Sequence, residues 1–139
     1  MVQDAEIFNL YKYFIWADRM KTAYDALLDK NIQEPIPRAK FEMESNLYMS
    51  YWFGALYVVI EGWKQLHLSD RKIASLLDSP NVNLLRRYRN GVFHFQRDYF
   101  DERFLSFLRD GINRIEWTRN LHHEFEGYFS EWAEGSGFL

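Results

Sequence analysis

The chain has 139 residues, the length of one ordinary domain, and its 47% hydrophobic and 19% aromatic residues exclude a disordered protein. It contains no cysteine, which excludes disulfide bonds, a thiolate nucleophile and a thiolate metal site. The net charge of −3 argues against broad electrostatic attraction to nucleic acid, so any RNA contact requires a local basic patch.

Apolar residues recur at three- and four-residue steps in several segments, and each such segment predicts an α-helix. The expected helices lie near residues 4–30, 37–66, 70–78, 82–93 and 101–133. No segment shows the alternating pattern of a strand. The sequence therefore predicts an all-α fold, a four- to five-helix up-and-down bundle, in a single domain of residues 1–139.

Proline and capping residues set the expected helix boundaries. Pro35 and Pro37 separate the first two helices, because a residue before proline is pushed out of the helical region. Ser69 or Asp70 offers an N-cap to the third helix, and the Ser79–Pro80 step ends it. The last predicted helix carries the longest regular stripe of the chain, which continues through position 111 without a predicted break.

The expected compartment follows from two absences in the sequence. The N-terminal MVQDAEIF has no basic start and no unbroken apolar run, so it does not resemble a signal peptide. The longest uncharged stretch, residues 45–60, is shorter than the roughly 20 apolar residues that a membrane-spanning helix needs. We therefore expect a soluble, cytoplasmic protein without a membrane partner.

The densest basic cluster lies in residues 84–97. Arg89 and Asn90 stand just before His94, and this order of arginine, polar residue and histidine resembles the signature of the HEPN family. Arg87 also stands at a permitted distance from His94. HEPN domains are helical bundles that carry the motif at the end of a late helix, just before the final long one. The predicted fourth helix ends at this segment.

The resemblance implies a metal-independent endoribonuclease or RNase toxin that cleaves RNA through the 2′-hydroxyl. It needs no cofactor and no metal. The implied assembly is a homodimer, which the aromatic excess also favours, and a protein antitoxin is a possible partner. His94 would act as base or acid near neutral pH, and Arg89 would grip the scissile phosphate through two hydrogen bonds. Asn90 would orient the imidazole or a substrate hydroxyl.

Neighbouring residues are the expected substrate-binding groups. Arg86, Arg87 and Arg97 would hold flanking phosphates, although a solvated helix face is the common role of the first two. Tyr88 would stack on a base. Phe93 and Phe95 could do the same, but the expectation from their apolar character is the core.

Glu61 follows an apolar run in which a charge must be paired or exposed, and its expected partner is Arg89 or Arg87.

Two alternatives to the ribonuclease interpretation stay open. Arg89 and His94 can be structural, as an ion pair and a helix-terminal cap. The chain can also be a non-catalytic helical module that binds RNA, a nucleotide or a protein partner.

One further constellation has the spacing of a metal site. His122, His123 and Glu126 would place a histidine and a carboxylate on one helical face. His122 lies on the apolar stripe, however, where a histidine is more often a satisfied core or interface residue. We therefore predict no metal site.

Overall fold

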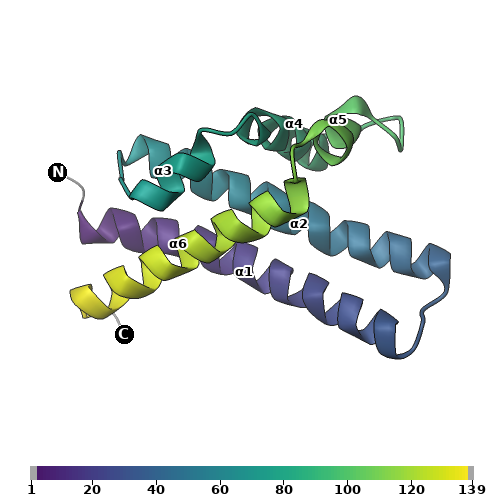
Figure 1. Ribbon diagram of the computed structural model, residues 1–139, viewed down its shortest axis with the longest axis horizontal. Coiled ribbons are helices and arrows are strands. Elements are labelled where there is room, and N and C mark those ends of the chain that lie inside the picture. Colours follow the sequence, from purple (N-terminus) through teal and green to yellow (C-terminus); the bar gives the residue numbers. More distant parts are fainter. Residues whose placement is uncertain (1–2, 138–139) are drawn as a thin grey trace.

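Two long helices run side by side and support the rest of the chain. The computed structural model describes residues 3–137, which form six α-helices. The first two, α1 (Asp4–Gln33) and α2 (Arg38–Gln65), form an antiparallel hairpin (Figure 1). The side chain of Asn31 accepts a hydrogen bond from the backbone N–H of Ile36 at 2.9 Å, which fixes the turn between them.

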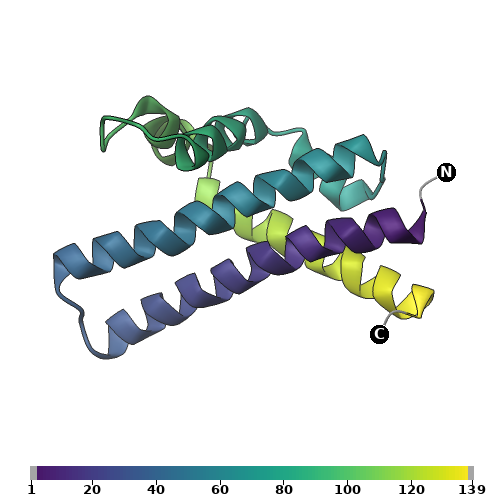
Figure 2. The same cartoon turned by 180° about the vertical axis from the view of Figure 1, so that it is seen from behind.

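The remaining helices pack on two sides of this hairpin. α3 (Arg71–Leu77), α4 (Asn81–Phe93) and α5 (Glu102–Asp110) return along α2, with α4 against α2 and α5 against α4. α6 (Arg114–Ser136) crosses the hairpin obliquely (Figure 1). From behind, α2 lies between α1 and α4, with α6 on the opposite face (Figure 2).

The predicted all-helical fold is confirmed for residues 3–137, which contain no strand. The up-and-down arrangement is not, because α6 lies across the α1–α2 hairpin instead of alongside it. The predicted single domain also included residues 1, 2, 138 and 139, which lie outside the described residues. No helix among residues 3–137 combines the length and hydropathy needed to cross a membrane.

α2 occupies the centre of the core, as its nearly continuous apolar sequence predicts. Five of its side chains are fully buried, namely Trp52, Phe53, Leu56, Val59 and Ile60. Rings from α4, α5 and α6 pack around them, and edge-on contacts join Phe53 to both Tyr88 and Phe107. Much of the aromatic content of the chain therefore serves the packing of short helices against α2.

A buried histidine links three of the helices. His122 of α6 is only 1% exposed, and its Nδ1 accepts a hydrogen bond from Trp52 Nε1 of α2 at 3.1 Å. Indole nitrogen can only donate, so the ring proton sits on Nε2, which donates to Asp18 of α1 at 3.0 Å. The prediction of a satisfied core histidine is confirmed.

The predicted final helix over 101–133 is wrong at one point, because the chain breaks into α5 and α6 at residues 111–113. Gly111 leaves the helical conformation, and Asn113 has φ 45° in the left-handed region. The side chain of Asn81, itself buried, holds both backbone groups of Ile112, with hydrogen bonds of 2.9 Å and 2.7 Å. The break gives residues 3–137 six helices, where a bundle of four to five was predicted and five ranges were expected.

The other predicted boundaries agree with the structure to within three residues. Asp70 is the N-cap of α3, since its side chain accepts from the N–H groups of Lys72 and Ile73. Asn81 is the first residue of α4. Asp70 was one of the two expected N-caps, and α4 begins one residue before the predicted position 82, so both starts follow from capping and proline chemistry.

The stability of the fold should decrease as the pH falls from about 7.5 to 5. Burial lowers the pKa of His122 below its ordinary 6.5, so below that pH the unfolded chain takes up a proton that the folded chain resists. The associated free energy of unfolding is fully present above about pH 6.5 and decreases below it, by up to about 1.4 kcal/mol per pH unit. Urea unfolding followed by circular dichroism at several pH values measures this slope.

The matched variants are His122→Gln and His123→Gln, because His123 is exposed on the same helix. The first should flatten the dependence of stability on pH and the second should preserve it. An equal slope in His122→Gln and the parent would contradict the neutral, buried state assigned to His122.

Candidate functional site

The site predicted from sequence lies where α4 passes over α2. Phe93, the last residue of α4, packs its ring on Gly54 of α2, where an added Cβ would lie 2.9 Å from the ring. The side chain of Arg89, one turn earlier on α4, lies over the same glycine. Gly54 therefore permits the close approach that brings the end of α4, and the arginine, onto α2.

Arg89 is held on one side by three contacts. Its Nη1 donates to Glu61 Oε1 at 2.5 Å, its Nε donates to Asn90 Oδ1 at 3.1 Å, and its guanidinium lies 4.9 Å from the Tyr57 ring centroid. The predicted pairing of Glu61 with an arginine is thus confirmed. The two side chains are 23% and 38% exposed. Arg89 Nη2 has no hydrogen-bond partner among residues 3–137, so one edge of the guanidinium is available to a ligand.

His94 lies just beyond the helix. It is the C-cap of α4, with extended φ −127° and ψ 128°, and its side chain is exposed. Its imidazole has no partner among residues 3–137, and no contact there joins it to Arg89. Asn90 was expected to orient the His94 ring or a substrate hydroxyl. Its side-chain oxygen accepts from Arg89, and no hydrogen bond joins it to the His94 ring among residues 3–137.

Three arginines, Arg86, Arg87 and Arg97, were predicted to hold flanking phosphates. Arg97 is exposed, Arg87 is partly exposed, and neither side chain has an ionic partner in the described part of the chain. Arg86 is exposed and bonded to Asn83 Oδ1 at 2.8 Å and 3.1 Å. These three cations remain available to phosphates.

Tyr88 cannot stack on a base in this arrangement, and its predicted role is corrected. The residue is 2% exposed, and its hydroxyl lies 3.3 Å from Ser50 Oγ on α2. Burial raises the pKa of Tyr88 to about 12, so the phenol stays neutral. The ring faces the core because it continues the apolar stripe of α4 toward α2 and α5.

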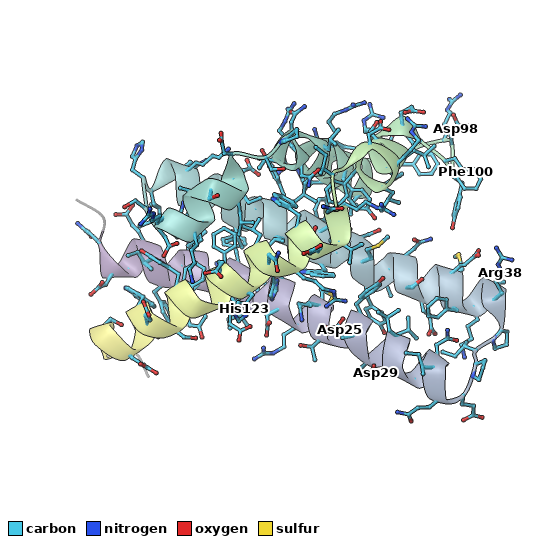
Figure 3. All side chains as sticks on the ribbon, viewed as in Figure 1. Asp25, Asp29, Arg38, Asp98, Phe100 and His123 are labelled. Carbon is cyan, nitrogen blue, oxygen red and sulfur yellow. The ribbon has the colours of Figure 1, made fainter. Side chains whose placement is uncertain are left out.

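Phe93 and Phe95 show the opposite correction, since both were expected in the core and both are exposed, at 51% and 93%. Two further exposed aromatic residues on the same loop, Tyr99 and Phe100, were not predicted. The loop between α4 and α5 projects past both helices and carries Phe100 near its tip (Figure 3). A signal was present in the sequence, because residues 94–100 lie between two predicted helices and carry three aromatic residues.

The loop is nevertheless anchored at both ends. Asn46 of α2 donates to the Tyr99 hydroxyl at 3.0 Å. Arg103 at the start of α5 donates to Gln96 Oε1 at 2.8 Å and pairs with Asp101. The exposed rings are therefore presented by a braced loop next to His94.

One group of side chains has metal-ligand chemistry. Ligand atoms of Asp18, His122 and Glu126 lie within 4.8 Å of one another. The bond from Trp52 places the only ring proton of His122 on Nε2, the atom that faces Asp18. That nitrogen then has no lone pair to offer a cation, so this arrangement is a structural one.

No family model, curated protein or solved structure matches the chain. The HEPN resemblance therefore depends on Arg89, Asn90, His94 and their place at the end of α4.

The coupling between Arg89 and Glu61 should be modest, about 0.5–1 kcal/mol, because both side chains retain contact with water. A double-mutant cycle with Arg89→Gln and Glu61→Gln, measured by urea unfolding, gives this value. The more exposed pair of Arg109 and Glu102 is the reference and should give a smaller coupling. A coupling above about 3 kcal/mol would identify Arg89 as a structural cation that is not free to bind phosphate.

Proposed function

We propose that the protein is a metal-independent endoribonuclease that uses Arg89 and His94, as its resemblance to HEPN ribonucleases implies. One observation carries the proposal. Arg89 is oriented by its bonds to Glu61 and Asn90 while its Nη2 has no partner among residues 3–137, and the end of the same helix presents an exposed imidazole that also has no partner there. A cation of fixed orientation and an imidazole that can exchange protons are the requirements of this reaction.

The chemistry assigns a separate task to each group. An imidazole takes the proton of the 2′-hydroxyl, whose oxygen attacks phosphorus and forms a 2′,3′-cyclic phosphate. The bond from phosphorus to the 5′-oxygen breaks, and that oxygen receives a proton. Arg89 donates to the equatorial oxygens, where negative charge increases in the transition state. Asn90 fixes Arg89, and Arg86, Arg87 and Arg97 hold flanking phosphates.

A second copy of the chain would complete this site. One His94 cannot both accept the first proton and donate the second within one step, whereas two can. Exposed apolar side chains lie on α2, at the end of α4 and on the loop after α4, namely Leu47, Tyr51, Phe93, Phe95, Tyr99 and Phe100. Such a patch favours a two-fold homodimer with both motifs beside one cleft.

One observation favours the alternative of a non-catalytic binding module. Glu61 already partly neutralises Arg89, and a phosphate must compete with that carboxylate. An RNA-cleavage assay distinguishes the two functions, because a binding module binds RNA without cutting it.

The protein should cut single-stranded RNA in the presence of EDTA and leave a 2′,3′-cyclic phosphate. His94→Ala should lower the rate by about 10²–10⁴-fold, because proton transfer is lost while the exposed ring contributes little to the fold. Arg89→Lys should also be inactive, since lysine keeps the charge but loses the planar two-point grip. Gel analysis of labelled RNA measures the cleavage rates, and mass spectrometry of the product ends detects the 2′,3′-cyclic phosphate.

Matched controls are available in the chain. His123 is exposed on α6, away from the loop after α4, and His123→Ala should cut at the parental rate (Figure 3). Arg71 is exposed at the start of α3, and Arg71→Lys should also be active. If diverse RNAs stay intact, or if His94→Ala cuts as fast as the parent, the ribonuclease proposal fails.

The protein should be a dimer at micromolar concentration by light scattering. Phe95→Ser should weaken the dimer, because this side chain is almost fully exposed on the loop that borders the motif. Ile112→Ser is the matched control, since Ile112 is also exposed but lies at the α5–α6 break. A monomeric parent would contradict the shared site.

A further inference from the structure

Two exposed aromatic rings stand together where the end of α4 meets α2. The ring centroids of Tyr51 on α2 and Phe93 on α4 are 6.0 Å apart, and the ring planes meet at 62°. The two side chains are 46% and 51% exposed, although covering an aromatic ring is favourable. Both rings therefore present apolar surface that a ligand can cover.

Gly54 sets the distance from these rings to Arg89. A Cβ added at Gly54 would lie 2.9 Å from Cε2 of Phe93 and 3.9 Å from Cγ of Arg89, so both side chains rest on the same point of α2. Tyr51 precedes Gly54 by three residues, about 4.5 Å of helix rise, and contacts the same Phe93 ring. The stem of the arginine and the two rings are thus immediate neighbours.

The guanidinium of Arg89 extends from Gly54 in the opposite direction along α2. It reaches Tyr57 and Glu61, while the rings lie toward Tyr51. The helix rise between Tyr51 and Tyr57 is about 9 Å, a distance that a phosphate and the base of an adjoining nucleotide can span. A strand that lies along this face of α2 can therefore meet the cation with a phosphate and the rings with a base.

We infer that Tyr51 and Phe93 form a stacking platform for the unpaired base next to the phosphate that Arg89 binds. This inference rests on the proposed action on RNA and deepens it, because it names the residues that hold a base. It also defines the substrate class as a strand with unpaired bases of any type.

The chemistry of the rings supports this substrate class. Every base has an aromatic face, and stacking on tyrosine or phenylalanine adds affinity without reading the hydrogen-bonding edge of the base. A base inside a duplex is already paired and stacked on both sides, so a platform of this kind recognises single-stranded segments. The platform therefore selects the form of the RNA and not its sequence.

Phe93 also connects the platform to His94. The two residues are consecutive, with Phe93 as the last residue of α4 and His94 as its C-cap. The Phe93 ring is held by its contact with Gly54, and the exposed imidazole follows directly. A base stacked on Phe93 therefore keeps its nucleotide close to the group that exchanges protons, which favours the reactive geometry.

The exposed apolar patch then serves two ligands. Phe95, Tyr99 and Phe100 lie on the loop after α4, where a second copy of the chain can cover them. Tyr51 and Phe93 lie on the helices beside Arg89. A cleft shared by two motifs needs walls that protein does not cover, and these two rings border the cation that must meet RNA.

The test compares two strands that cannot be cut, a 2′-O-methyl pentamer of uridylate and the same backbone without bases. Fluorescence anisotropy of an end label gives both dissociation constants. The parent should bind the uridylate pentamer about tenfold more tightly, because stacking adds affinity that phosphate contacts lack. The double variant Tyr51→Leu and Phe93→Leu should bind the two strands about equally, since leucine keeps an apolar side chain but has no aromatic face.

Two control variants isolate the effect of the rings. The exchange of Tyr51→Phe with Phe93→Tyr keeps both aromatic faces and should retain the tenfold difference. Trp16→Leu removes a ring that is 53% exposed on α1, across α2 from α4 (Figure 2), and should retain it too. Circular dichroism and light scattering check the fold and the oligomeric state of each variant. Tyr51→Leu alone should reduce the difference and replaces the double variant if that variant does not fold.

The outcomes separate this inference from the ribonuclease proposal. If RNA is cut but the parent binds both pentamers equally, or if the leucine variant keeps the difference, the platform fails while the proposed activity stands. A leucine variant that becomes monomeric yet keeps the difference assigns the rings to the dimer contact and also overturns the platform. If the difference depends on the rings but unmodified RNA stays intact, the platform stands and the ribonuclease proposal fails. Equal binding of both pentamers without cleavage overturns both.

Discussion

The need to pair one carboxylate organises the face on which the candidate site lies. Glu61 sits on α2, the helix that forms the centre of the core, and its partly buried carboxylate is stabilised by a counter-charge, modestly because the side chain stays 38% exposed. Arg89 supplies the counter-charge from α4, with the Tyr57 ring beneath its guanidinium. One residue thus fixes the orientation of the arginine to which we assign phosphate binding.

Local chemistry was sufficient to predict most of the fold. Apolar periodicity located the helices, and proline and Asp70 set several of their ends, because these signals act within a few residues. The break at Gly111 escaped prediction because the next residue, Ile112, is clamped by Asn81, which lies 31 positions before Ile112 in the chain. Apolar residues on both sides of the break face the same core. The apolar periodicity of residues 101–133 therefore continues across the break, and the sequence gives no sign of it. The oblique crossing of α6 likewise depends on packing between distant helices.

The candidate site was predictable only in its charged part. The pairing of Glu61 with Arg89 follows from the general rule that a charge in an apolar run needs a partner. The aromatic residues were assigned wrongly because their exposure depends on which face of α4 meets α2 and α5. Tyr88 faces that contact, while Phe95 follows the end of the helix and leaves it.

The most direct test of the central claim replaces a single oxygen of the substrate. An RNA that the protein cuts at one position is resynthesised with a 2′-deoxy residue on the 5′ side of that bond, and cleavage there is compared with cleavage of the all-ribose strand. The account predicts that the modified bond stays intact while binding persists, because the nucleophile is gone and the contacts of Arg89 remain. Cleavage of the modified bond at an undiminished rate would contradict it, since the attacking oxygen would then have to come from water.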